Sequence, residues 1–188
     1  MGSPTSQEDH AGEGPALVHL YDAGDRTPPH DLLARERQVI SFEMPHTAAT
    51  MLGAVSGLGI DQFDLMGTSS GATIALTAAL AAPERVRALV LESPAATGPP
   101  AGDLELEGAL SGLRVPVLVV IGTEAGPIAA ETGRTLKQLL PNCQLLYVYD
   151  AGDAVAADRP EAFAEAVSDF LERHEQYVVS RRSSVLFP

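Results

Sequence analysis

The sequence lacks tryptophan, and aromatic residues of all kinds make up only 5% of its 188 residues. This scarcity argues against the aromatic platforms on which single-stranded nucleic acids stack. Basic residues are also few, since 12 Lys and Arg stand against 25 Asp and Glu, for a formal net charge of −13. Nucleic-acid phosphates are bound by clusters of Lys and Arg, so no nucleic-acid partner is expected.

Cys143 is the single cysteine, so an internal disulfide is impossible and the sequence is typical of a reducing cytoplasm. No apolar run approaches the roughly 18 residues that span a bilayer, and no secretory signal is recognisable. The spacings typical of zinc sites, phosphate-binding loops and dinucleotide-binding turns are missing too. The sequence therefore predicts a cytoplasmic protein that has no membrane-spanning segment, no metal and no cofactor.

Short apolar runs alternate with helical patterns along the chain. Near-continuous Val, Leu and Ile runs are typical of strands covered on both faces. These runs lie at 16–21, 38–42, 63–66, 87–92, 115–121 and 144–149, and the helical patterns lie at 47–57, 70–82, 129–140 and 159–174. This order predicts an α/β fold with a mostly parallel sheet and helices on both faces.

The length suits one domain, which we place at residues 15–174. Residues 1–14 are small, polar or acidic and predict a disordered N-terminal tail. Residues 95–113 are rich in Gly, Pro and acidic side chains and predict a surface connection. Residues 175–188 form a C-terminal extension that either packs on the domain or pairs with a second subunit, so a homo-oligomer stays open.

The segment GTSSG at 67–71 has the form G-x-S-x-G, with Ser69 at its centre. It follows a predicted strand and opens a predicted helix. A nucleophile elbow requires this context, because the two glycines allow a sharp turn that exposes the serine in a strained conformation. A plain Gly/Ser turn is the alternative, and the context favours the elbow.

Together with this motif, several blocks of the sequence resemble successive blocks of the α/β-hydrolase superfamily. They are PALVHLYDAGD, RQVISFEMPH, GIDQFDLMGTSSGATIALTAALAAPERVRALVLESP, LRVPVLVVIGTEAGPI and LLYVYDAGDAVAADRPEAFAEAVSDFLERH. The resemblance covers about residues 15–174 and implies the α/β-hydrolase fold with a reduced cap over 95–113. It also implies acyl transfer by a Ser nucleophile, a His base and an Asp or Glu acid.

The nucleophile and the oxyanion donors match this pattern in part. Ser69 stands at the nucleophile position, and the backbone N–H of Ser70 stands at one oxyanion donor. The family's His-Gly pair is replaced by Tyr21-Asp22, which makes the Ala23 N–H the second donor. The Asp22 carboxylate has the wrong charge to lie beside a developing oxyanion.

The position of the base departs from the family. Asp153 stands where the resemblance places the His, and a carboxylate of ordinary pKa is a poor base for a hydroxyl. His46 is the one histidine that we keep as a candidate base, because it follows a strand at the edge of the sheet where such sites lie. The others are expected to be packed, loop or surface residues: His10, His19, His30 and His174.

The position of the acid departs as well. Ala125 occupies the expected place after the strand at 115–121, and Glu124 substitutes only by a shift of register. Glu92 is a second candidate acid, because it ends the strand after the elbow helix, where some family members carry that residue. A plain strand-end carboxylate is the alternative reading.

The pentapeptide YDAGD occurs twice, at 21–25 and 149–153. In the family fold Asp22 and Asp153 would both approach Ser69, where two carboxylates repel unless a divalent cation or a cationic ligand lies between them. Two carboxylates and a hydroxyl are thin ligation for Ca²⁺ or Mg²⁺. Drift at a disused site is the alternative explanation.

A retained nucleophile elbow together with a replaced base and acid leaves three functions open. The first is a catalytically impaired or non-hydrolytic protein that binds a small molecule. The second is a serine hydrolase for a small ester, thioester or lactone, whose base is His46 or Asp153 and whose acid is Glu92 or Glu124. The third is a structural or interaction subunit that docks through an apolar rim.

Overall fold

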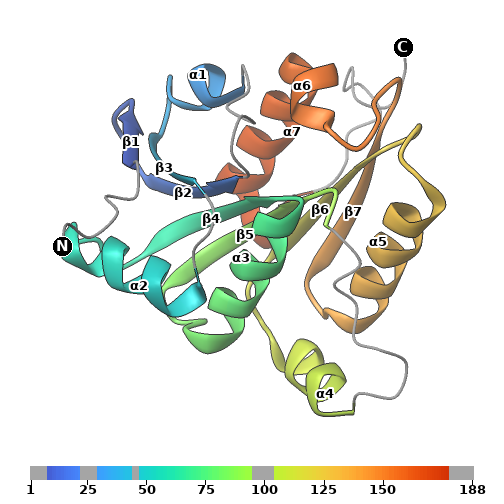
Figure 1. Ribbon diagram of the computed structural model, residues 1–188, viewed down its shortest axis with the longest axis horizontal. Helices are drawn as coiled ribbons and strands as arrows, with labels where there is room; N and C mark the ends of the chain where they lie inside the picture. Colours follow the sequence, from blue (N-terminus) through green and yellow to red (C-terminus); the bar gives the residue numbers. More distant parts are fainter. Residues whose placement is uncertain (1–7, 22–28, 44–46, 95–103, 178–188) are drawn as a thin grey trace, which may run out of the picture.

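The structure is a computed structural model that describes residues 8–21, 29–43, 47–94 and 104–177 (Figure 1). Within these ranges seven strands form one sheet: β1 (Glu8–Ala11), β2 (Ala16–Tyr21), β3 (Gln38–Glu43), β4 (Phe63–Thr68), β5 (Val86–Glu92), β6 (Val117–Gly122) and β7 (Cys143–Val148). Their order is β1-β3-β2-β4-β5-β6-β7. Strand β1 runs antiparallel to β3, and the other neighbours pair in parallel.

Helices cover both faces of this sheet. They are α1 (Pro29–Leu33), α2 (Ala48–Gly57), α3 (Ser70–Ala81), α4 (Leu104–Gly112), α5 (Pro127–Leu139), α6 (Val155–Asp158) and α7 (Pro160–Arg173), followed by a 3₁₀ turn at His174–Gln176. Helices α2, α3 and α5 pack on one face, and α1, α6 and α7 on the other (Figure 1). The predicted α/β fold with a mostly parallel sheet is confirmed.

The central strands are buried on both faces, which explains their continuous apolar sequences. In β2, Val18 and Leu20 belong to the core under α2 and α3, whereas Leu17 belongs to the core under α7. All three side chains are 0% exposed. Because such strands show no polar alternation, the apolar runs located them within two residues at each end.

The prediction of a disordered tail over 1–14 is wrong for Glu8–Ala11, which form β1. This strand pairs with the outer side of β3, with Glu8 opposite Phe42 and Ala11 opposite Val39. Its sequence EDHA carries almost no apolar signal, because an edge strand is held mainly by its backbone ladder. Charged side chains are also a common protection of exposed sheet edges.

The connection between β5 and β6 is too short for a separate cap domain, in agreement with the predicted reduced cap. In its described part it contains only α4, nine residues long. Leu110 of this helix is fully buried in the core under α3 and α5. Across the described residues, no helix combines the length and the apolar character needed to cross a membrane.

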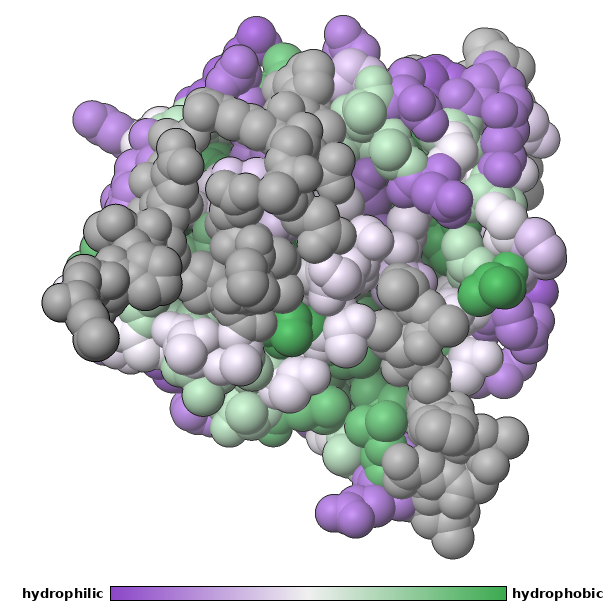
Figure 2. Space-filling view, viewed as in Figure 1, coloured by the Kyte–Doolittle hydropathy of each residue, from purple (hydrophilic) through white to green (hydrophobic). Residues whose placement is uncertain are grey.

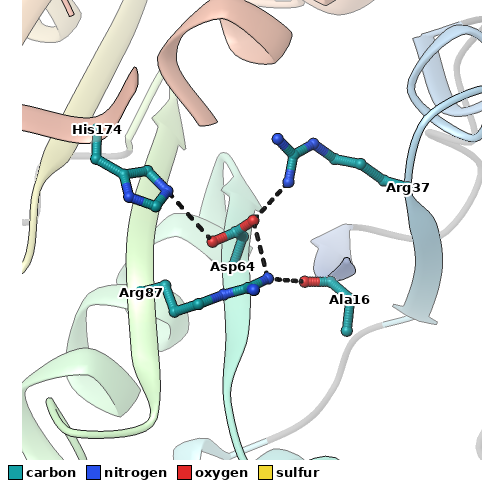
Figure 3. A network of polar contacts seen from close by, with 5 residues as sticks. All are labelled: Ala16, Arg37, Asp64, Arg87 and His174. Carbon is teal, nitrogen blue, oxygen red and sulfur yellow. Dashed lines mark hydrogen bonds and ion pairs between the residues drawn. The ribbon is translucent and has the colours of Figure 1, made fainter. Parts of the chain in front are cut away.

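A buried ion network lies near the start of β4, at the end of the strand opposite Ser69 (Figure 3). The Asp64 side chain is 1% exposed and accepts a hydrogen bond from Arg37 Nη1 at 2.6 Å. Arg87 Nη2 lies 3.2 Å from the same carboxylate and 3.3 Å from the Ala16 carbonyl oxygen. His174 Nε2 lies 4.0 Å from Asp64 Oδ1. His174 was expected to be a solvated surface residue; its side chain is 37% exposed, with Nε2 turned toward this network.

Burial raises the pKa of Asp64, and the nearby charges of Arg87, Arg37 and His174 oppose that shift. An isolated carboxylate at this depth would be costly, so the two guanidinium groups are required for Asp64 to remain ionised. We assign the network a structural role, because it is far along the strand from the elbow.

Candidate functional site

The loop between β4 and α3 forms a sharp, strained turn at Ser69. This residue has φ 53° and ψ −112°, a region that side-chain-bearing residues rarely adopt. Its backbone is held on both sides, since its N–H donates to the Glu92 carbonyl at 3.0 Å and its carbonyl accepts from the Ala72 N–H at 3.2 Å. The strained conformation is therefore imposed by the surrounding sheet and helix.

The two glycines of the motif are required by close packing. A Cβ added to Gly67 would overlap the Gly71 carbonyl oxygen, and a Cβ added to Gly71 would overlap the Leu20 carbonyl oxygen. Helix α3 can therefore lie against β4 and β2 only if both positions lack a side chain. A strained serine between two obligatory glycines is the geometry of a nucleophile elbow.

Ser69 opens into a cavity of about 370 Å³ at the carboxyl ends of the strands. Ligands of open parallel sheets commonly bind at this edge, and the volume lies in the range of small-molecule sites. The described residues that line it are Ser69, Ser93, Pro94, Gly126, Pro127, Ile128, Ala129 and Asp153. The structure thus brings Ser69 and Asp153 into one cavity.

Close packing of two loops positions Asp153. A Cβ on Gly122, at the end of β6, would overlap the Ala151 carbonyl oxygen, and the Glu124 N–H donates to that oxygen at 2.9 Å. The loop after β6 therefore lies against the loop after β7. In the loop after β6, Glu124 is exposed and does not line the cavity, whereas Ala125 packs its methyl group against the core.

Glu92 is turned away from the cavity. Its side chain is buried, with Oε1 accepting from the Ala156 N–H at 2.7 Å and Oε2 accepting from the Thr68 hydroxyl at 3.1 Å. These contacts lie on the side of the sheet covered by α6 and α7. Glu92 was a candidate acid, but in the structure its carboxylate positions α6 and the last residue of β4.

A buried polar chain continues from Thr68 to two histidines. His19 Nε2 lies 3.0 Å from Thr68 Oγ1, and His19 Nδ1 contacts His30 Nε2. The Tyr21 ring stacks on His19 with centroids 5.4 Å apart. Burial, and then the charge of His30, lower the pKa of His19 well below its ordinary value. His19 is packed, as expected, whereas His30 was expected in a loop and instead lies buried in α1.

None of the histidines that the structure describes lines the Ser69 cavity: His10, His19, His30 and His174. The predicted site residues Asp22, Ala23 and His46 lie outside the described residues, whereas Ser70 is the first residue of α3 and Tyr21 ends β2. Within the described ranges no three His, Cys, Asp or Glu side chains gather as a metal site.

Sequence reasoning missed Ser93. It follows β5 with φ 39° and lines the same cavity as Ser69. The residue is 8% exposed, and its Oγ has no hydrogen-bond partner among the residues that the structure describes. A serine after a strand gives no local signal of this kind, because the missing partner is a property of the tertiary structure.

A larger cavity of about 580 Å³ lies at the opposite, amino end of β5 and β6. It is lined by apolar side chains such as Leu80, Val86 and Leu113, and apolar residues gather between α3 and α4 in Figure 2. Arg87 also lines it, but its guanidinium is paired with Asp64. No serine, cysteine or histidine is among its described lining residues, so we place the candidate site at Ser69.

Comparisons with known proteins agree with this geometry. The sequence profile of the α/β-hydrolase fold matches residues 22–110. An α/β-hydrolase enzyme from a sediment metagenome of the Mar Chica lagoon, Morocco, superposes with a TM-score of 0.78 at 20% identity, over 92% of this chain and 98% of that one. A predicted CIB-like hydrolase from Thermoplasma acidophilum gives a TM-score of 0.69 at 16% identity, over 89% and 98%.

Naproxen esterase from Bacillus subtilis gives a TM-score of 0.72 at 16% identity, over 87% of this chain and 86% of that one. No curated protein matches the sequence. The likenesses in structure establish the fold, and the matched profile covers the elbow itself. The chain therefore has the α/β-hydrolase fold, and its residues 22–110 match the sequence profile of that fold.

Proposed function

We propose that this protein is a catalytically impaired member of the superfamily that binds a small molecule in the Ser69 cavity. One observation carries the proposal. Asp153, at the position where the resemblance places the base, shares the cavity with Ser69, and no described histidine does. Ala125 stands in place of the acid, so the two partners that activate the nucleophile are both replaced.

The chemistry of serine explains why this replacement matters. A serine hydroxyl is a weak nucleophile unless an adjacent base takes its proton. Asp153 is exposed, and a carboxylate is a far weaker base toward a hydroxyl than the imidazole that it replaces. Enzymes that lose a triad member retain only a residual rate, roughly 10³–10⁴-fold over water, from binding and the oxyanion hole.

A working serine hydrolase is the second candidate, and the strained Ser69 favours it. Strained residues concentrate at functional sites, and an unused elbow has no need to keep one. In this alternative the base is His46 or Asp153. The acid is then Glu92, whose carboxylate is bonded to Thr68 and Ala156, or Glu124, which is exposed in the loop after β6.

Turnover of small activated esters and thioesters from pH 6 to 9 separates the two candidates. We expect wild type and Ser69→Ala to hydrolyse them at the same low rate, with Ser111→Ala, an exposed serine of α4 outside the cavity, as the control. Ser69-dependent turnover at rates typical of enzymes would overturn the proposal. A base limb near pH 6–7 that disappears in His46→Ala would then identify the base.

A further inference from the structure

We propose that the Ser69 cavity binds a small molecule composed of an apolar body and an ammonium group, with Asp153 and Ser93 as its polar partners. This inference rests on the proposed function, because it assigns the ligand class of the same cavity. It is argued from the charge, the unpartnered hydroxyl and the walls of the cavity.

Asp153 is the one charged residue among the described residues that line the cavity. It is exposed and forms no hydrogen bond or ion pair with a described residue. Arg159 is the cation that follows along the chain. Its Nη1 lies 3.7 Å from Asp150 Oδ2 and donates to the Tyr149 carbonyl oxygen at 2.7 Å, so this guanidinium pairs with other groups than Asp153. The carboxylate therefore attracts a cationic ligand and repels an anionic one.

Ser93 supplies a second polar partner. Its Oγ is buried beside the cavity on a strained backbone, and no described residue forms a hydrogen bond with it. Buried polar atoms are nearly always hydrogen-bonded, so an exception at a cavity wall points to a missing ligand. An ammonium group has three N–H donors, which suit the Asp153 carboxylate and the Ser93 hydroxyl as acceptors, and it needs no basic side chain as a partner.

The remaining walls are apolar. Pro94, Pro127 and Ala129 line the cavity, and Ile128 beside them is 67% exposed. A large apolar side chain left exposed at a cavity wall favours a ligand with an apolar body. A metal ion would require further carboxylate ligands, whereas an amine of this type can be bound by the single carboxylate of Asp153.

Binding of three compounds with one skeleton tests the inference: 4-phenylbutylamine, 4-phenylbutanol and 4-phenylbutyrate. Affinities are measured by calorimetry on the Ser69→Ala protein at about 0.15 M salt, which screens the general attraction of an acidic protein for amines. We expect the amine to bind about ten-fold more tightly than the carboxylate, with the alcohol between them. Equal affinities, or no binding of the amine, would overturn the inference.

Variants test whether Asp153 provides the negative charge that attracts the amine. Asp153→Asn should weaken the amine about ten-fold and leave the alcohol nearly unchanged, and Ser93→Ala should weaken both compounds. Glu124→Gln is the matched control, because it removes an exposed carboxylate of the adjacent loop that does not line the cavity. An equal effect of Asp153→Asn and Glu124→Gln on the amine would contradict a specific site.

The result is independent of catalysis, since Ser69→Ala cannot use the serine. Loss of the amine preference together with low turnover of the wild type would remove the ligand class and leave the proposed function standing. An amine preference together with fast Ser69-dependent turnover would support the ligand class and remove the proposed impairment.

Discussion

Ser69 has a strained backbone conformation that costs free energy, and a glycine at this position would avoid that cost. Its φ of 53° is set by bonds to Glu92 and Ala72 and by the packing of Gly67 and Gly71. Strain of this kind is typically worth about 1–3 kcal/mol. The protein retains it although the resemblance to the α/β-hydrolases places Asp153 and Ala125 at the base and acid positions.

Replacing Ser69 with glycine should relieve this strain. We expect Ser69→Gly to raise the free energy of unfolding by about 1 kcal/mol, since glycine adopts this conformation freely but loses more entropy on folding. Ser111→Gly, in the ordinary helical backbone of α4, should lower it by about 0.5 kcal/mol. Urea denaturation measures both, and a loss of stability in Ser69→Gly would show that the turn is unstrained.

At the scale of elements, the contact between α3 and the sheet depends on glycine. Gly67→Ala should destabilise the protein by about 3 kcal/mol or more, because the new methyl group overlaps backbone atoms that cannot move alone. Gly53→Ala in α2 meets no atom within 4 Å and should stabilise by about 0.5–1 kcal/mol. Thermal or urea unfolding of both variants checks the contrast, and similar effects would contradict the close packing.

The Asp64 network joins elements that are distant in sequence. Arg37→Met should cost about 3 kcal/mol of stability, because it removes one of the cations that compensate a buried carboxylate. Arg134→Met is the control, since the Arg134–Glu131 pair is largely exposed and screened by water, so its loss should change stability little. Equal losses in the two variants would mean that the network has no special role.

The elements themselves were predicted from the sequence better than the site. Buried strands such as β6 show continuous apolar runs, so their positions follow from local sequence. Helix α1 and strand β1 were missed, because the sequences PHDLL and EDHA are too short and polar to give a periodic pattern. The pair of His19 and His30 and the unpartnered Ser93 arise only when distant segments meet, so no local pattern predicts them.

At the scale of the whole molecule, stability should depend on pH through His19. Its pKa is lowered in the folded state, so between that value and about 6.5 the unfolded chain binds more protons. Stability should therefore fall as the pH drops below about 6.5, by up to about 1.4 kcal/mol per pH unit. Asp64, whose pKa is raised, contributes the opposite slope at lower pH.

Urea unfolding at several pH values between about 7.5 and 5.5 isolates the His19 contribution. His19→Gln should flatten the profile relative to the wild type, because it removes the buried imidazole whose pKa is lowered. Parallel profiles for wild type and His19→Gln would show that His19 is protonated equally in both states.

Activation of Ser69 is what distinguishes a working hydrolase from an impaired one. Labelling with a fluorophosphonate at pH 6 to 9 tests this most directly, because the probe reacts with activated serines and needs no knowledge of the substrate. We predict no difference between wild type and Ser69→Ala, and Ser69-dependent labelling once Asp153→His and Ala125→Asp are combined. Rapid Ser69-dependent labelling of the wild-type protein would contradict the central claim that its catalytic site is impaired.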